Sequence, residues 1–226
     1  SNLQKNQELK SILLEETPWV LQAKTEAEQK RNIALLFDMV KMGSELSASL
    51  EKLRQMQSSN GGFVWFKGGP DDRYITQYIV TGIGHLRKLN AAYSAHEKQL
   101  NEILNTAIAY LDRKIKEDYD RLLKSKANLD QQQIGFYGIQ YLYMRSFFRG
   151  HRISESTLVA YNYYLGQAKK FWTKQNKYMQ GMIALALHRR NDKTIPAAVL
   201  KSLKETSIVH EELGMYWKNE ARGWFW

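Results

Sequence analysis

The chain has 226 residues and a net charge of +10; 43% of its residues are hydrophobic, 25% are charged and none is cysteine. This composition is typical of a soluble globular protein and excludes a disordered chain or a membrane bundle, since the longest apolar runs are far shorter than the ~20 residues of a membrane span. The absence of cysteine excludes disulfide scaffolds, zinc–thiolate sites, iron–sulfur clusters and cysteine nucleophiles. The chain opens on polar residues without a signal-peptide pattern, so we expect any export signal to lie outside this sequence.

The positive charge is concentrated between His151 and Lys204, where ten Lys and Arg residues outnumber two acids, Glu155 and Asp192. A basic surface of this kind attracts nucleic acid, anionic lipid or acidic protein. The chain has no arginine-rich tract, recognition-helix signature or RNA-binding aromatic motif. We therefore predict a solvated helix surface and no nucleic-acid partner.

Apolar residues recur with helical spacing nearly everywhere, and two kinds of helix are expected. Helices with one apolar stripe and one charged side are expected to start near residues 44, 97, 155 and 195. In the second of these, the stripe runs from Leu100 to Leu122, and Asp112 and Lys116 stand on the opposite, charged side. Helices that are apolar on most of their circumference, and so must be covered on most sides, are expected near 74–89, 132–149 and 177–189.

The alternation of these two kinds of helix predicts an all-α fold with two helix layers. An up-and-down bundle would need one apolar stripe in every helix. We therefore predict that residues 1–226 form a single α/α-toroid domain, a partial ring of helical hairpins with inner and outer helix layers. A helical solenoid is the alternative, because its repeats also pair and stack helices.

Loops rich in glycine and aromatic residues follow the first and the last of the charged helices. The first is Ser59–Phe66, after which Gly69-Pro70-Asp71-Asp72 provides a helix start signal. The second includes Trp217, and the chain ends at Trp226 without the further inner helix that the pattern predicts. We therefore expect a fragment of a larger multidomain protein. Its apolar surface beside residues 178–187 would be covered by the terminal aromatic residues or, through weak self-association, by a second copy.

Metal and nucleophile motifs give no catalytic residue. His210-Glu211-Glu212 begins like a zinc-protease helix, but Gly214 stands where the second histidine would be. None of the five histidines has a histidine partner at helical spacing, and the chain has neither a nucleophile elbow nor a phosphate-binding glycine loop. The sequence thus predicts no catalytic, cofactor-binding or metal-binding residues.

The sharpest polar cluster is Asp71, Asp72 and Arg73, at the start of an expected inner helix. Trp65 and Phe66 lie just before it, and Trp217 occupies the corresponding later loop. In one interpretation Asp72 acts as an acid or base and Trp65 as a stacking platform. In the other, which we favour, the acids cap the helix and the aromatic residues close the end of the core.

The run LRQMQSSNGGFVWF at Leu53–Phe66 is followed by YITQYIVTGI at Tyr74–Ile83. Together they resemble the thioester-domain region of alpha-2-macroglobulin-like proteins, particularly the large bacterial ones. In that region a helix ending in Gln, an Asn/Asp-Gly-aromatic turn and an inner helix opening with Thr-x-aromatic recur around an α/α toroid. Tyr178–Leu187, Val199–Leu203 and Met215–Lys218 are similar to a later hairpin of that family and the aromatic loop after it. The resemblance covers most of the chain from about Leu36 onward.

This resemblance implies a domain of an endopeptidase inhibitor that traps proteases after they cut a bait segment elsewhere in the molecule. Members with a thioester use a Cys-x-Glu-Gln motif, which this cysteine-free chain lacks; either the motif lies upstream, or the parent belongs to a thioester-free branch. The resemblance therefore implies no enzyme and no cofactor. It implies an extracytoplasmic location (periplasmic or in the cell envelope), with target proteases and the parent's other domains as partners. Membrane contact would occur only through parts of the parent outside this chain.

Two other functions stay open from the residues alone. One is an α/α-toroid enzyme, a lyase or hydrolase, that acts on polyanionic carbohydrate and attracts it through the basic stretch. The other is a peptide-binding helical repeat module. An enzyme needs an open cleft with convergent ionisable groups, whereas a repeat module needs a long concave groove with exposed aromatic residues.

Overall fold

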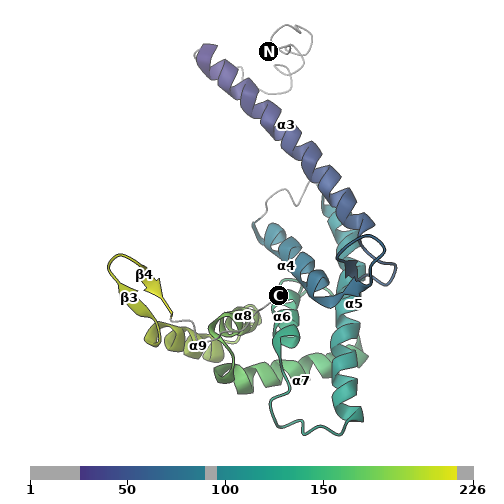
Figure 1. Ribbon diagram of the computed structural model, residues 1–226, viewed down its shortest axis with the longest axis vertical. Coiled ribbons are helices and arrows are strands. Elements are labelled where there is room, and N and C mark those ends of the chain that lie inside the picture. The colour runs from purple at the N-terminus through teal and green to yellow at the C-terminus, as the bar shows by residue number, and fades with distance from the viewer. Residues whose placement is uncertain (1–25, 90–95, 218–226) are drawn as a thin grey trace. The chain divides into compact units, whose positions relative to one another are not determined.

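The computed structural model describes residues 26–89 and 96–217, and the chain divides into two compact units between Leu53 and Arg54. The described part of the first unit is α3 (Glu26–Gln55), which continues two residues past this boundary (Figure 1). We predicted a helix that starts near residue 44, but α3 begins at Glu26. The segment before residue 44 is rich in Ala, Glu, Gln, Leu, Lys and Met, which propagate a helix without a strong apolar stripe.

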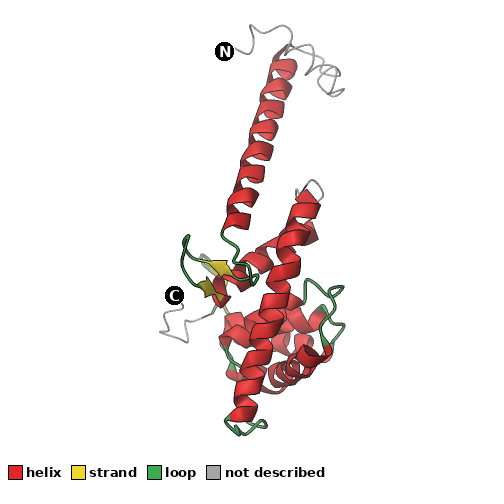
Figure 2. Cartoon of the chain, turned by 90° about the vertical axis from the view of Figure 1, so that its right-hand side faces the viewer, coloured by secondary structure: helices red, strands yellow, loops and turns green. Residues whose placement is uncertain are grey.

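The second unit is built of helices, as Figure 2 shows in red, so the all-α prediction is confirmed. Its helices are α4 (Arg73–Leu89), α5 (Glu97–Lys124), α6 (Phe136–Arg145), α7 (Glu155–Phe171), the 3-10 turn Trp172–Lys174, α8 (Lys177–His188) and α9 (Thr194–Glu205). Short antiparallel pairs lie in the loops: β1 (Phe63–Val64) with β2 (Asp71–Asp72), and β3 (Ile208–His210) with β4 (Gly214–Tyr216).

The contacts between helices in the second unit follow chain order. The helices that we predicted as inner, α4, α6 and α8, pack on one another in succession, while α5 packs on α4, α6 and α7, α7 on α6, and α9 on α8. The predicted bounds of α4 and α8 are correct to within one residue. In contrast, α6 is shorter than the predicted 132–149: it starts after Gly135, and turns replace its last predicted residues.

The apolar stripe of α5 forms the centre of the core, and its residues from Leu100 to Ile115 are buried as predicted. The charged side was predicted incorrectly at one position. Asp112 is 8% exposed, because it pairs with Arg145 of α6 instead of facing water. Within the described ranges, none of the helices combines the length and the apolar character needed to cross a bilayer.

Candidate functional site

The glycine–aromatic loop after α3 is tied firmly to α4 and α5. The side-chain Nε2 of Gln57 donates to the carbonyl oxygens of Gly61 (3.0 Å) and Ile103 (3.1 Å) and to Oγ1 of Thr106 (3.0 Å). Phe63 is fully buried, and its amide donates to Oγ1 of Thr76 in α4 over 2.8 Å. Gln57–Phe63, a part of the run that carries the sequence resemblance, therefore forms a structural clasp.

Asp72 caps α4. Its Oδ1 accepts a hydrogen bond from the amide of Ile75 over 2.8 Å, and its carbonyl oxygen accepts one from Oγ1 of Thr76 over 2.7 Å. The first bond satisfies one of the amides that a helix start leaves without an intrahelical partner. Of the two sequence interpretations of Asp72, the geometry favours the structural one.

We expect Asp72→Ala to lower the free energy of unfolding of the second unit by about 0.5–2 kcal/mol, because α4 would lose its capping acceptor. Asp72→Asn keeps an acceptor at the same place and should stay within a few tenths of a kcal/mol of the parent. Urea unfolding monitored by circular dichroism measures both values. Equal losses in the two variants would contradict the capping role.

Asp71, the neighbour of Asp72, is hydrogen-bonded to the clasp. Its Oδ1 accepts a hydrogen bond from the side chain of Asn60 over 3.1 Å. A hydrogen bond from the buried Tyr110 hydroxyl, and then the one from Asn60, hold the pKa of Asp71 below its usual 3.8 against the opposing effect of burial. The carboxylate is thus held in its charged form.

The lowered pKa of Asp71 predicts a pH effect. Because the folded pKa lies below the unfolded value, its contribution to stability is complete above the unfolded pKa and is lost as the pH falls through the folded pKa, below 3.8. We therefore expect the difference in unfolding free energy between the parent and Asp71→Asn to be constant near pH 6 and to shrink below pH 3.8. Unfolding curves between these values test this, and an unchanged difference would refute it.

Arg73 belongs to a different group from its two acidic neighbours. Its guanidinium forms an ion pair with Asp118 of α5, which also binds Arg121. Nε donates to Oε1 of Gln77 over 3.1 Å, and Cζ lies 5.4 Å from the centroid of the Tyr137 ring. Arg73, Asp118, Arg121 and Tyr137 border an open pocket of about 430 Å³, in which the carboxylate of Asp118 binds both arginines.

The aromatic candidates do not converge. Trp65 and Phe66 are 63% and 65% exposed, so the prediction that they close the end of the core is wrong; the Phe66 ring lies against Gly69. Trp217 follows β4, where its Nε1 donates to the carbonyl oxygen of Leu203 over 2.7 Å. The β3–β4 pair and the clasp lie on opposite sides of the second unit (Figure 1), so the six candidate residues form no common site.

The sequence analysis missed an aromatic face on α4, α6 and α8, because it expected these helices to be covered on most sides. Tyr74 of α4 packs on Phe136 of α6, with ring centroids 6.0 Å apart. Near the other end of the same helices, the Tyr143 hydroxyl and His85 Nε2 lie 3.2 Å apart. Tyr178 of α8 is 69% exposed. Tyr74 and Tyr143 are half-buried and Tyr178 is exposed, which distinguishes this face from a core.

His85 and Arg189 add ionisable groups to the aromatic face. Burial first, and then the positive charge of Arg189, lower the pKa of His85 below its usual 6.5. The imidazole is therefore neutral at pH 7 and can accept or donate a hydrogen bond with Tyr143. The guanidinium carbon of Arg189 lies 3.7 Å from the centroid of the Phe147 ring.

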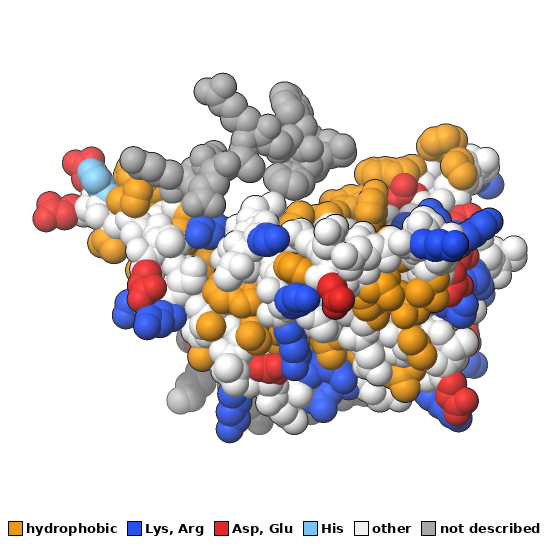
Figure 3. Space-filling view, turned by 90° about the horizontal axis from the view of Figure 1, so that it is seen from below, with side chains coloured by type: hydrophobic (Ala, Val, Ile, Leu, Met, Phe, Trp, Pro, Cys, Tyr) orange, Lys and Arg blue, Asp and Glu red, His pale blue; other side chains and the backbone are white. Residues whose placement is uncertain are grey.

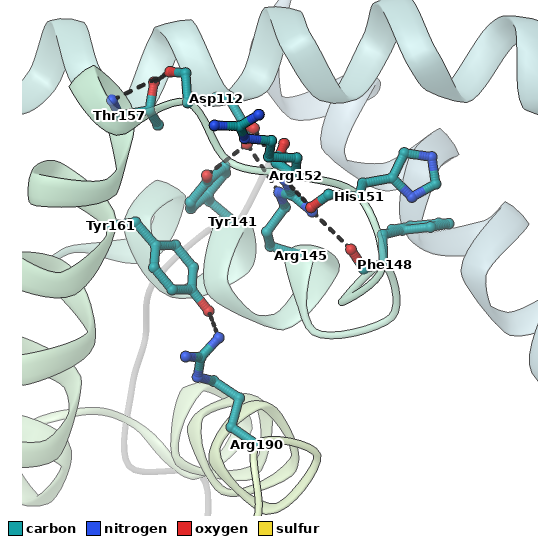
Figure 4. Close-up of polar contacts among 10 residues, drawn as sticks. Asp112, Tyr141, Arg145, Phe148, His151, Arg152, Thr157, Tyr161 and Arg190 are labelled. Carbon is teal, nitrogen blue, oxygen red and sulfur yellow. Dashed lines mark hydrogen bonds and ion pairs between the residues drawn. The ribbon is translucent and has the colours of Figure 1, made fainter.

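A buried ion pair joins α5 to α6 (Figure 4). Arg145 Nε donates to Asp112 Oδ1 over 3.0 Å, and its Nη2 donates to Oδ2 over 3.1 Å. The other bonds of the guanidinium go to the carbonyl oxygens of Phe148, His151 and Arg152. The Tyr141 hydroxyl donates to Asp112 over 2.6 Å, and burial raises the pKa of this tyrosine well above 10. The bonds satisfy a side chain that is only 2% exposed.

A second open pocket, of about 520 Å³, lies next to this pair. The described residues that line it are Arg87, Phe147, Phe148, Arg149, Gly150 and His151. Burial first, then Arg145 and Arg87, lower the pKa of His151, while Asp112 opposes them. The surroundings of His151 are therefore predominantly cationic.

The basic stretch His151–Lys204 is largely surface. Figure 3 shows the Lys and Arg side chains on the α7 side in separate groups among neutral and hydrophobic atoms. One of them, Lys169, is paired with Asp192 over 2.7 Å. Across residues 26–89 and 96–217, no group of His, Cys, Asp and Glu side chains is arranged to hold a metal ion.

No family model, curated protein or solved structure matches the chain. The function is therefore argued from the residues and their geometry.

Proposed function

We propose that this chain is a thioester-domain-like helical domain of an alpha-2-macroglobulin-like endopeptidase inhibitor, without catalytic chemistry of its own. The observation that carries the proposal is the clasp Gln57–Phe63. The run that resembles the family is held by hydrogen bonds from Gln57 to α5 and from Phe63 to Thr76 of α4. A repeat pattern that builds a scaffold fits this geometry better than a catalytic fingerprint does.

The architecture fits the same proposal. The inner and outer helices would belong to an incomplete α/α toroid, because α4, α6 and α8 pack in succession beneath their outer partners. The protein would act outside the cytoplasm, in the periplasm or cell envelope. Its partners would be target proteases and the other domains of the parent, with any membrane contact outside this chain.

The experiment uses the complete polypeptide that carries this chain. After incubation with a protease, the residual activity is measured on a large protein substrate and on a small peptide substrate. An enclosed protease should lose most activity on the protein and keep most activity on the peptide, because only the peptide can reach it. Equal loss of both activities, or no loss, would refute a trapping inhibitor.

A polyanionic-carbohydrate enzyme is the second candidate, and one observation favours it. The neutral His85 lies beside the Tyr143 hydroxyl, and Arg189 packs over the Tyr143 ring with 5.0 Å between its Cζ and the ring centroid. A phenol with a hydrogen-bonded base can exchange a proton with a sugar ring, and an arginine can hold a carboxylate. Depolymerisation of a uronate polysaccharide that is abolished by Tyr143→Phe would support this function. The absence of any depolymerisation would exclude it for the polymers tested.

Weak self-association of this chain is a further part of the proposal. Tyr178 and Leu185 lie on one side of α8 and are 69% and 45% exposed, while most of the helix is buried. Burial of a few hundred Å² of such surface would contribute several kcal/mol, at about 25 cal/mol per Å². The terminal aromatic residues Trp224–Trp226, the predicted alternative cover, lie outside the described residues.

We expect Leu185→Lys to weaken self-association about tenfold or more, because a charge would be desolvated in the interface. Leu200→Lys, at an exposed position on α9, is the matched control and should have little effect. Sedimentation equilibrium measures both dissociation constants. A parent chain that stays monomeric at high concentration would refute the proposal.

A further inference from the structure

Helices α4 and α6 run in the same direction, and the segment after α8 contacts the segment after α6. Near their starts, Gln77 of α4 donates to Gln140 of α6 over 2.9 Å; near their ends, His85 of α4 contacts Phe147 just after α6. After α6 and α8, Arg149 donates to the carbonyl oxygen of Arg189 over 2.6 Å. The carboxyl ends of these helices therefore form one end of the second unit.

This end is rich in arginine. α4 contributes Arg87, the turn after α6 contributes Arg149 and Arg152, and Arg189 and Arg190 follow α8. Cations near helix carboxyl ends are favoured by the helix dipole, and this explains part of the enrichment. It does not explain why Arg149, four residues past the end of α6, borders a pocket with Arg87 and His151.

The charge balance of this pocket differs from that of the Arg73 pocket. In the Arg73 pocket, Asp118 binds both Arg73 and Arg121 and compensates their charge. In the pocket at the carboxyl ends, none of the described lining residues is acidic. Asp112, the carboxylate that acts on His151, is bound in both oxygens by Arg145 and accepts a hydrogen bond from the Tyr141 hydroxyl. The Asp112 carboxylate is therefore already paired with Arg145 and does not line the pocket.

We propose that the pocket lined by Arg87, Arg149 and His151 binds an oxyanion of the sulfate or phosphate-ester class. Arginine guanidinium groups match such oxyanions with paired N–H donors. The turn between Phe147 and His151 shapes the floor of the pocket, with the His151 ring packed edge-on against Phe148 at 5.7 Å. The volume of about 520 Å³ exceeds that of the bare anion, so a small carrier of the group also fits.

The pKa of His151 should report the binding of an oxyanion in this pocket. The charged groups that act on it are Arg145 of α6, Arg87 of α4 and Asp112 of α5. A bound oxyanion would offset the arginines and raise the pKa of the imidazole. The ring resonances of His151 should therefore move on binding and titrate at higher pH in the complex than in the free protein.

The test is an NMR titration of the ring signals of His151 with inorganic sulfate and inorganic phosphate, at an ionic strength kept constant with sodium chloride. We expect saturable shifts and a raised pKa for His151. Arg149→Gln and Arg87→Gln should each weaken binding about tenfold, corresponding to about 1.4 kcal/mol. Arg121→Gln, which removes an arginine from the carboxylate-containing pocket, is the matched control and should change affinity less than twofold.

Glucose 6-sulfate and glucose 6-phosphate distinguish the source of the group. Tighter binding of the sugar esters than of the inorganic ions would indicate an anion carried on a glycan, whereas equal or weaker binding would indicate the free ion. Shifts that grow linearly without saturation, or equal losses in Arg149→Gln and Arg121→Gln, would overturn the proposal. Arg149 and Arg87 are exposed, so both variants should fold, and circular dichroism checks this.

Discussion

Arg145→Met should lower the free energy of unfolding of the second unit by about 3–5 kcal/mol, because it leaves a buried carboxylate without its partner. The variant keeps most of the volume of the side chain but removes both bonds to Asp112. It also removes the hydrogen bonds that the guanidinium donates to the carbonyl oxygens of Phe148, His151 and Arg152, and so destabilises the turn after α6. Urea unfolding gives the value from the shift of the midpoint.

Arg121→Met is the control for the loss of a surface arginine. Its side chain is 75% exposed, so its ion pair with Asp118 should contribute no more than about 1 kcal/mol. Replacing both buried partners, in Asp112→Leu with Arg145→Met, should recover part of the loss because no unpaired charge remains. A single-variant loss as small as that of the control would show that the pair is not a major stabilising contact.

Gly61→Ala should destabilise the second unit by about 2–5 kcal/mol. Gly61 has a φ of +94°, in the left-handed region, and a Cβ placed there would lie 2.1 Å from the carbonyl oxygen of Thr106. The substitution therefore adds backbone strain to an overlap with helix backbone that cannot move freely. The clasp would have to move away from α5, with loss of the bonds from Gln57.

The matched control is Gly68→Ala. Gly68 also has a positive φ, +85°, but a Cβ there meets no atom within 4 Å. Its loss should be close to the conformational cost alone, about 1 kcal/mol. The difference between the two variants isolates the contact with Thr106. Similar losses in both would mean that the overlap is relieved without cost.

Helical periodicity predicted where most helices of the second unit lie, because burial on one or several sides of a helix produces a regular spacing of apolar residues. It could not place the ends of α6, where the signal is tertiary: the amide of Gln133 donates to Oε1 of Gln167 over 2.8 Å and holds residues before Gly135 out of the helix. Asp112 was misplaced for the same kind of reason. Its partner, Arg145, lies on another helix, and no spacing within α5 reveals it.

For the candidate site as well, local contacts could be predicted from the sequence and contacts between helices could not. The capping role of Asp72 could be predicted because it depends on residues within one helical turn. The contact between His85 and Tyr143 could not be predicted, because the two residues lie 58 positions apart in the chain and on different helices. Tyrosine in an inner helix also has the spacing of a core residue, and only its exposure identifies it as part of a surface.

The succession of helix contacts has a consequence for how the second unit folds. Each described helix packs mainly on its neighbours one or two elements away, from α4 to α9, so closure of very long loops is rarely needed. Such low contact order favours fast folding, in which one hairpin forms a template for the next. Translation delivers the helices in this same order. The second unit can therefore fold from its amino-terminal side during synthesis. Local unfolding that begins at α9 should reach α4 only after the hairpins between them have unfolded.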